Sequence, residues 1–153
     1  MDAYPLFKES DERVRELKPE YILDGRRTTT LESFCKEVGQ TLLAGQPWDE
    51  NLDGFHAVLR GDYGYLPEEF RLVWREVDYA RAALGYDETV RQLLQRLRDC
   101  PPTALIKTAW ALRAALRKQG PTVFDWLVDA INKHPNVELV MVAMTDAVEP
   151  LPL

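Results

Sequence analysis

The spacing of apolar residues predicts a chain in which strands and helices alternate. "YILDG", residues 21–25, is typical of a buried strand that ends at a turn glycine. Thr29 and Glu32, three positions apart, form a capping-box pattern that predicts the start of a helix. The apolar positions that follow recur at helical spacing and are Leu31, Phe34, Cys35, Val38 and Leu42. A strand followed by a helix is therefore expected.

A second helix is expected after the break at "GQPW", with Asn51 as its cap and Gly61 as its end. Its apolar face should hold Leu52, Phe55 and Leu59, and its opposite face Asp53, Ala57 and Arg60. "FRLVW", residues 70–74, then indicates a second strand. A short helix over residues 77–84 should follow this strand.

Three further helices and a last strand complete the pattern. Asp87 is expected to open a helix that ends at "CPP", and a second helix should run to Gly120. The apolar stripes predicted for these two helices are Val90, Leu93, Leu94 and Leu97, and Leu105, Ala109, Leu112 and Leu116. Pro121 suits the first position of a final helix. That helix should direct Phe124, Leu127, Val128 and Ile131 inward and Asp125, Asp129 and Asn132 outward, before the strand "VELVMV", residues 137–142.

Strands separated by long helical segments favour the α/β class, with a small three-stranded parallel sheet packed with helices. Residues 1–18 are polar and are expected to form an N-terminal extension with at most a short helix. Residues 19–145 should form a single domain that carries a helical insertion at about 86–118. Residues 146–153 are expected to be a proline-bearing tail.

Composition and charge narrow the classes of function. The 153 residues are 46% hydrophobic and 29% charged, as in an ordinary soluble globular protein. The net charge of −6 argues against non-specific nucleic-acid binding and favours a basic partner. No signal peptide is apparent, and the longest apolar tract, interrupted by Lys107 and Arg113, is too short to cross a bilayer. A cytoplasmic protein without a membrane partner is expected.

No catalytic, metal or cofactor pattern is visible. Cys35 and Cys100 lack metal-ligand or CxxC spacing and suggest reduced structural thiols. The only conventional bases are His56 and His134, for which structural roles are favoured, and no GxSxG frame or nucleotide-binding loop occurs. We therefore expect no enzymatic activity, no metal site and no cofactor.

Acidic and aromatic residues gather between positions 47 and 65. They are Trp48, Asp49, Glu50, Asp53, Asp62, Tyr63 and Tyr65. A solvated face with helix-dipole partners accounts for Asp49 and Glu50. A protein-binding surface accounts better for the other acids and the aromatics. Composition alone leaves these two interpretations evenly matched. The basic stretch 91–118 is more typical of a solvated helix surface than of a nucleic-acid face.

A family resemblance separates the two interpretations. The first strand ending in "LDG", then "ENLDGFHAVLRG", "FRLVW" and "VFDWLVDAINKHPNVELVMV" occur in the order and spacing of the barstar family. The chain resembles these intracellular inhibitors of the secreted bacterial ribonuclease barnase over residues 20–85 and 120–143. The resemblance implies the same three-stranded parallel sheet packed with helices.

The resemblance also implies a site. In the family, acids on the "NLD" helix and on the last helix plug the basic active site of the ribonuclease and mimic RNA phosphates. The corresponding acids in this chain are Glu50, Asp53 and Asp129. Ala57 stands where the family's inhibitor has its principal aspartate, and Pro47 and Asp62 replace aromatic contacts. Roughly two dozen residues are inserted between Gly85 and Gly120, about the size of a helical hairpin.

These observations suggest an intracellular immunity protein that binds and blocks the basic active site of a ribonuclease or a related nuclease toxin, and whether barnase itself is inhibited is left open by Ala57, Pro47 and Asp62. The expected partner-binding residues are Trp48, Asp49, Glu50, Asp53, Asp62, Tyr63 and Asp129. An alternative is a regulatory or scaffold protein that uses the helical pair 86–118 as its interaction surface. RNA binding through the basic insertion and an unrecognised enzyme rank below these. The oligomeric state and the target are left open by the sequence.

Overall fold

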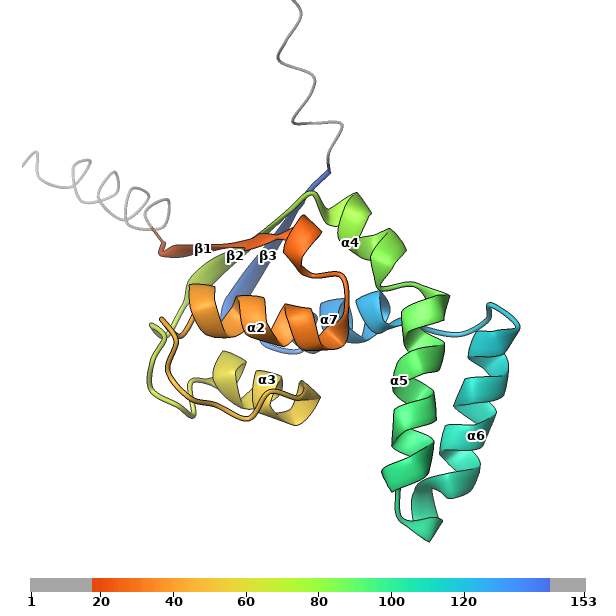
Figure 1. Ribbon diagram of the computed structural model, residues 1–153. Coiled ribbons are helices and arrows are strands. Elements are labelled where there is room, and N and C mark those ends of the chain that lie inside the picture. The colour runs from red at the N-terminus through yellow and green to blue at the C-terminus, as the bar shows by residue number, and fades with distance from the viewer. Residues whose placement is uncertain (1–17, 144–153) are drawn as a thin grey trace, which may run out of the picture.

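The computed structural model describes residues 18–143 (Figure 1). Most of the expected extension 1–18 and the whole expected tail 146–153 lie outside the described residues. The elements, in chain order, are β1 Glu20–Asp24, the 3-10 helix η1 Gly25–Arg27, α2 Leu31–Thr41, α3 Leu52–Arg60, β2 Phe70–Arg75, α4 Val77–Ala83, α5 Tyr86–Asp99, α6 Pro102–Leu116, α7 Val123–Asn132 and β3 Val137–Val142. The α/β class is confirmed.

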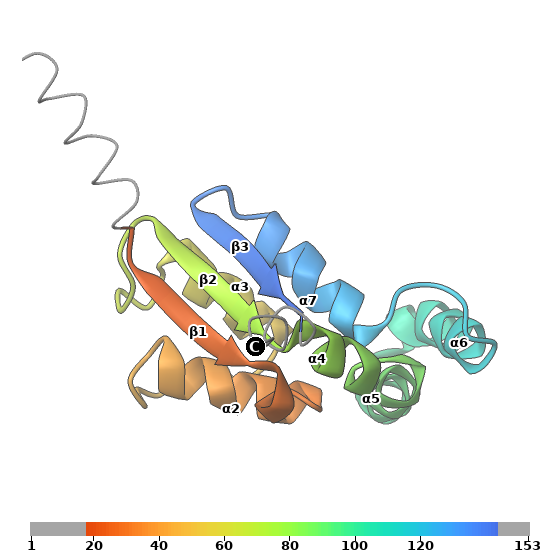
Figure 2. The same ribbon diagram turned by 90° about the horizontal axis from the view of Figure 1, so that it is seen from above.

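The sheet has three parallel strands in the order β1-β2-β3, so the predicted three-stranded parallel sheet is also confirmed. The central strand places Trp74 between Leu23 of β1 and Met141 of β3. Helices α2, α3 and α7 lie on the same face of the sheet, as the view from above shows (Figure 2). This face carries the core and positions the helices that hold the candidate site.

Trp74 is the centre of the core. It is fully buried, and its ring lies 5.4 Å from Phe34 of α2 and 5.2 Å from Phe124 of α7. Phe34 in turn meets Phe55 of α3 edge to face at 5.1 Å. The Trp74 indole N–H donates to the Thr28 hydroxyl at 3.1 Å, so its one polar group is satisfied inside the core. This single side chain therefore links the central strand to two helices directly and to α3 through Phe34.

The start of α2 differs from the prediction by one residue. Thr30, and not Thr29, is the cap: its hydroxyl accepts from the Ser33 amide at 3.0 Å, and the Ser33 hydroxyl accepts from the Thr30 amide at 2.9 Å. A run of three threonines offers several possible caps, and Ser33 can replace an acid as the reciprocal partner. Glu32 is thereby left free to bond Gln92.

The ends of α3 agree with the prediction. The Asn51 side chain accepts from the Gly54 amide at 2.7 Å, and Gly61 closes the helix at φ +86°. Gly54 is required because a Cβ there would lie 1.8 Å from the Asp49 carbonyl oxygen. By contrast, α7 is capped by Thr122, and Pro121 precedes the cap instead of opening the helix. Thr122 prevails because it shares a reciprocal capping box with Asp125.

The apolar stripe predicted for α5 is wrong in part, because this helix also buries polar side chains. Leu94 is 44% exposed, whereas Glu88 and Thr89 are buried. A Glu88 carboxylate oxygen accepts from the Leu31 amide at 2.9 Å, and the Thr89 hydroxyl accepts from the Val123 amide at 2.8 Å. These amides begin α2 and α7, where helices leave N–H groups without an intrahelical partner. The first turns of α5 therefore cap α2 and α7, two of the helices that pack on the sheet.

Ion pairs reinforce this junction. Arg91 bridges Glu32 and Glu88, and Gln92 also donates to both carboxylates. Burial opposes the charge of Glu88, but the hydrogen bonds from Arg91, the Leu31 amide and Gln92 outweigh it and lower the pKa of this carboxyl. Helices α5 and α6 form a helical hairpin, and its base is thus tied to α2 by charge-assisted hydrogen bonds.

The stripe predicted for α6 is also wrong in part, because only Leu112 of its four residues is half-buried. Ala115 is the buried residue of this helix, while Leu105 and Leu116 are exposed. The reason is that α6 packs on α5 and projects with it away from the sheet layers (Figure 1). Its apolar residues have no second layer of the domain to pack against.

Thr89→Val should lower the free energy of unfolding by about 1–3 kcal/mol, because the isosteric change leaves the buried Val123 amide without an acceptor. Urea denaturation measures this loss. Thr103→Val, an exposed site at the start of α6, is the matched control and should change stability by less than about 0.5 kcal/mol. Equal effects at both positions would contradict the capping role of Thr89.

Candidate partner-binding site

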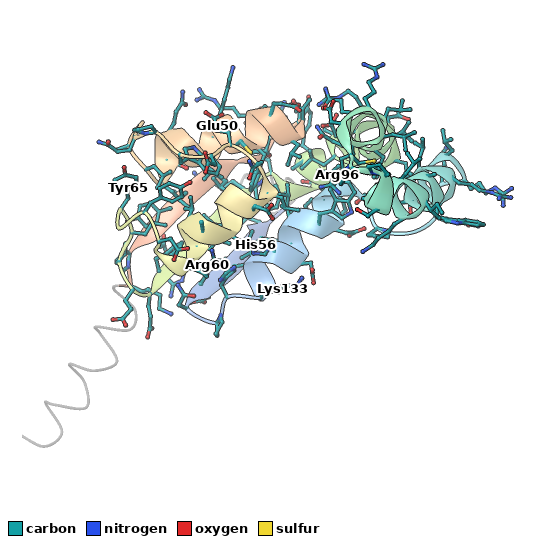
Figure 3. All side chains as sticks on the ribbon, turned by 90° about the horizontal axis from the view of Figure 1, so that it is seen from below. Glu50, His56, Arg60, Tyr65, Arg96 and Lys133 are labelled. Atoms are coloured by element: carbon teal, nitrogen blue, oxygen red, sulfur yellow. The ribbon has the colours of Figure 1, made fainter. Side chains whose placement is uncertain are left out.

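Helices α3 and α7 lie next to each other and present their outer sides on one face of the molecule, seen from below in Figure 3. Their inner sides are held by buried residues, among them Phe55, Leu59, Leu127 and Ile131. At the end of α7, His134 approaches α3 so that its Nε2 lies 3.0 Å from Nδ1 of His56. The two helices that carry the expected acids are therefore fixed to each other.

Asp53 lies exposed in the first turn of α3. Within residues 18–143 its carboxylate has neither an ion pair nor a hydrogen bond. Asp129 lies exposed on α7 and pairs with Lys133 of the same helix at 3.2 Å. Asp62 follows α3 and pairs with Arg60 at 2.8 Å. Of these three acids, Asp53 is therefore the one without a neighbouring cation, while Asp129 and Asp62 each have one.

Both of these ion pairs are exposed and local. The side chains of Asp129 and Lys133 are each more than 60% exposed, and those of Arg60 and Asp62 more than half exposed. Solvent-exposed pairs contribute only about 0–1 kcal/mol, since water screens them and both side chains lose freedom. Either carboxylate can therefore exchange its neighbour for a cation of a binding partner at little cost.

The loop before α3 is held by two of the expected aromatic residues. Trp48 is half-buried against α2, and its indole nitrogen lies so close to Gly39 that a Cβ there would be 2.9 Å away. Tyr63 is also half-buried, and its hydroxyl accepts from the Asp49 amide at 3.0 Å. These contacts fix the backbone that carries Asp49 and Glu50, both of which are exposed.

Tyr65 is the more accessible aromatic residue of this region. Its ring stacks on Tyr63 with centroids 6.1 Å apart and planes 13° apart, and 42% of the residue is exposed. Figure 3 shows it at the edge of the same face, on the loop after α3. A stacked tyrosine pair of this kind offers a preorganised apolar contact with polar hydroxyls.

A hollow of about 360 Å³ lies beside the loop, lined by Cys35, Gly39, Trp48 and Glu50 among others. Burial raises the pKa of the Cys35 thiol to about 12, with the charges of Glu50 and Glu32 adding to the effect. The thiol is thus protonated at neutral pH and unreactive. Cys35 and Cys100 are both free cysteines.

The histidine pair is the feature of this face that the sequence did not indicate. His56 and His134 are 78 positions apart, so no local pattern connects them, and structural roles were the most that the sequence favoured. Burial, then the neighbouring His56 and the charge of Arg60, lower the pKa of His134. The pair is stable while one ring donates and the other accepts, and two imidazolium rings would repel each other.

Neither a metal site nor a membrane span is found among residues 18–143. No group of three or more His, Cys, Asp or Glu residues in this range is arranged to hold a metal ion. No helix in the same range combines the length and the apolar character needed to cross a bilayer.

The comparison with known families decides the identity of the fold. A family model described as "Barstar (barnase inhibitor)" matches residues 19–103, more than half of the chain. The chain belongs to the barstar family. The match takes in β1, η1, α2, α3, β2, α4 and α5, and it ends at the start of α6. A search of curated proteins finds no match for this chain.

Membership of the barstar family agrees with the geometry outside the matched residues. β3 pairs in parallel with β2, and α7 packs on the same sheet face as α3, so the chain beyond residue 103 completes the layers. The family's description names the inhibition of barnase.

The His134 pair predicts a stability loss on mild acidification. Because the pKa of His134 is lowered in the folded protein, the unfolded chain binds the proton first. The contribution of neutral His134 to the free energy of unfolding is therefore complete above about pH 6.5 and is lost as the pH falls below this value. The free energy of unfolding, measured by urea titration, should fall between about pH 7 and 5.5, and His134→Gln should flatten this dependence.

The carboxyl groups with shifted pKa values titrate outside this pH range. The pKa values of Glu32, Glu88 and Glu138 are lowered, so these groups change the free energy of unfolding only below about pH 4.5. An NMR titration that gave His134 a pKa of about 6.5 or higher would contradict the assignment.

Proposed function

We propose that this barstar-family protein is a cytoplasmic immunity protein that blocks the active site of a basic ribonuclease or a related nuclease toxin. The observation that supports this most directly is Asp53, an exposed and uncompensated carboxylate on a helix packed beside the one that carries Asp129. The protein itself contributes no chemistry in this proposal. It covers the site where the nuclease holds RNA.

Charge complementarity would provide recognition. A nuclease holds RNA phosphates with arginine and lysine, and carboxylates at similar spacing satisfy the same groups. In this proposal Asp53 and Asp129 meet these cations, and Asp49, Glu50 and Asp62 strengthen the long-range attraction. The net charge of −6 acts in the same direction. Association should therefore be fast and should slow as salt is added.

The apolar part of the interface would differ from that of the family's inhibitor. Ala57, Pro47 and Asp62 remove one acid and two aromatic contacts and add one acid. Trp48 and Tyr63 support the loop from beneath, which leaves Tyr65 as the accessible ring. We infer a target whose active site differs from that of barnase around these positions.

A direct test is co-purification from the native cell, together with assay of any small basic nuclease encoded beside this protein. Stoichiometric addition of the protein should stop RNA cleavage by that nuclease. Full cleavage at a several-fold excess of the protein would contradict the proposal, whereas inhibition of barnase as a reference enzyme should be weak or absent.

Asp53→Lys should slow association with the inhibited nuclease by about tenfold or more at low salt, because it reverses the uncompensated charge. Stopped-flow fluorescence measures the rate. Asp99→Lys makes the same change of charge at the far end of α5 and should slow association by less than about threefold. Equal slowing in the two variants would place the interface elsewhere.

Lys133→Gln should act in the opposite sense. Removing this cation frees the Asp129 carboxylate and makes the face more negative, so association should become a few-fold faster. The same stopped-flow assay applies, with Lys107→Gln on α6 as a charge-matched control away from this face. Slower association of Lys133→Gln would indicate that Asp129 does not face the nuclease.

A further inference from the structure

Helix α6 presents large apolar side chains to the solvent. Ile106 is 71% exposed, Trp110 62% and Leu116 64%. The helix packs against α5, and both views show the hairpin projecting from the sheet layers (Figures 1 and 2). Large apolar side chains exposed along one helix indicate an interaction site, because leaving them in water is unfavourable.

Two of these residues, Ile106 and Trp110, line a groove along the helix. Ile106, Ala109, Trp110 and Arg113 line a depression of about 300 Å³. A second depression of about 280 Å³ is lined by Trp110, Arg113, Ala114, Arg117 and Gln119, so the two share Trp110 and Arg113. Positions 106, 110, 113 and 117 follow the helical repeat and form one row along the axis. A row of this kind accepts another helix laid alongside.

The groove is surrounded by positive charge. Residues 86–118 contain seven Lys and Arg against three Asp and Glu, whereas the whole chain contains 19 against 25. α6 contains no acid at all. Arg91 is paired at the base of the hairpin, and Arg96 lies over the Trp126 ring. Within residues 18–143 no ion pair is formed by Arg98, Lys107, Arg113, Arg117 or Lys118.

Arg113 is the residue that identifies the partner. Its guanidinium lies 5.5 Å from the centre of the Trp110 ring and lines both depressions, so it is part of the groove beside Trp110. An occupant that covers Trp110 must also take Arg113 out of water. A buried guanidinium needs a carboxylate or phosphate, which it binds through two parallel N–H groups.

We propose that the groove of α6 binds an acidic amphipathic helix of a second protein partner. Apolar residues of that helix cover Ile106 and Trp110, and its Asp or Glu residues pair with Arg113 and Arg117. The bound helix completes a three-helix cluster with α5 and α6. This surface is chemically opposite to the acidic face of α3 and α7 and does not depend on the proposed inhibition of a nuclease.

Other occupants fit these observations less well. A second copy of the chain, docked groove to groove, would bring together two α6 helices that carry cations and no acid. An anionic lipid surface would accommodate Trp110 and Arg113 but would repel the acidic remainder of a chain whose net charge is −6. RNA would satisfy the arginines but leave Ile106 exposed to water. A helix that combines apolar and acidic positions satisfies both groups at once.

The probe is a synthetic helical peptide of the same 15-residue length as α6, with Leu at i, i+4, i+7 and i+11 and Glu at the flanking positions. A control peptide has each Glu replaced by Lys. Fluorescence anisotropy with the full-length protein measures the affinity for both peptides. The variants are Trp110→Ala and Arg113→Glu in the groove, with Arg98→Glu as a control of equal charge change on the same hairpin outside the groove linings.

The acidic peptide should bind with micromolar affinity and at least about tenfold more tightly than the lysine peptide. Each groove variant should weaken binding by about tenfold or more, and Arg98→Glu by less than about threefold. Asp53→Lys should bind the peptide as the wild type does, which separates this surface from the acidic face. Because Trp110 and Arg113 are exposed, both variants should keep the wild-type circular dichroism and unfolding midpoint.

Several results would overturn the proposal. These are the absence of saturable binding, equal affinity for the two peptides, and equal losses in Arg98→Glu and Arg113→Glu. Tighter, Trp110-dependent binding to phosphatidylserine vesicles or to single-stranded RNA would assign the groove to those partners instead. A dimer in analytical ultracentrifugation that Trp110→Ala abolishes would assign it to a second copy of the chain.

Discussion

The arrangement of this protein depends on the burial of Trp74. The Trp74 ring in the central strand contacts Phe34 of α2 and Phe124 of α7. Phe34 in turn contacts Phe55 of α3. Large aromatic rings of this kind supply much of the apolar burial that stabilises a small domain. Because the hydrogen bond to Thr28 also fixes the indole, the helices that hold the acids have defined positions relative to one another and to the sheet.

On this frame the candidate site is assembled from weak and replaceable interactions. Strong contacts lie beneath the surface, where Trp48 and Tyr63 hold the loop and the histidine pair joins α3 to the end of α7. The carboxylates above them have either no partner or an exposed local one, as Asp53 and Asp129 illustrate. A rigid support with uncompensated charge is suited to electrostatic recognition, since little must be broken or ordered when a partner arrives.

The hairpin of α5 and α6 combines two roles along its length. Near the sheet, Glu88 and Thr89 cap two helices, so the base of the hairpin is part of the folded core. Farther out, α6 is apolar and positively charged, in contrast to the acidic remainder of the chain. The acidic face of α3 and α7 and the positively charged helix α6 are separate surfaces. A basic partner on the first would therefore not compete with an acidic partner on the second.

The sequence by itself determined the order of the elements, the parallel sheet and the ends of α3, because these depend on local periodicity and on the short-range chemistry of Asn51 and Gly61. It also showed the family resemblance, which indicated Asp53 and Asp129 as candidate acids. Only the tertiary structure decided that Glu88 and Thr89 are buried and that His56 meets His134. These facts depend on which distant segments approach one another. The same reason explains α6: helical spacing predicts an apolar stripe, but it does not tell whether any other layer of the protein will cover it.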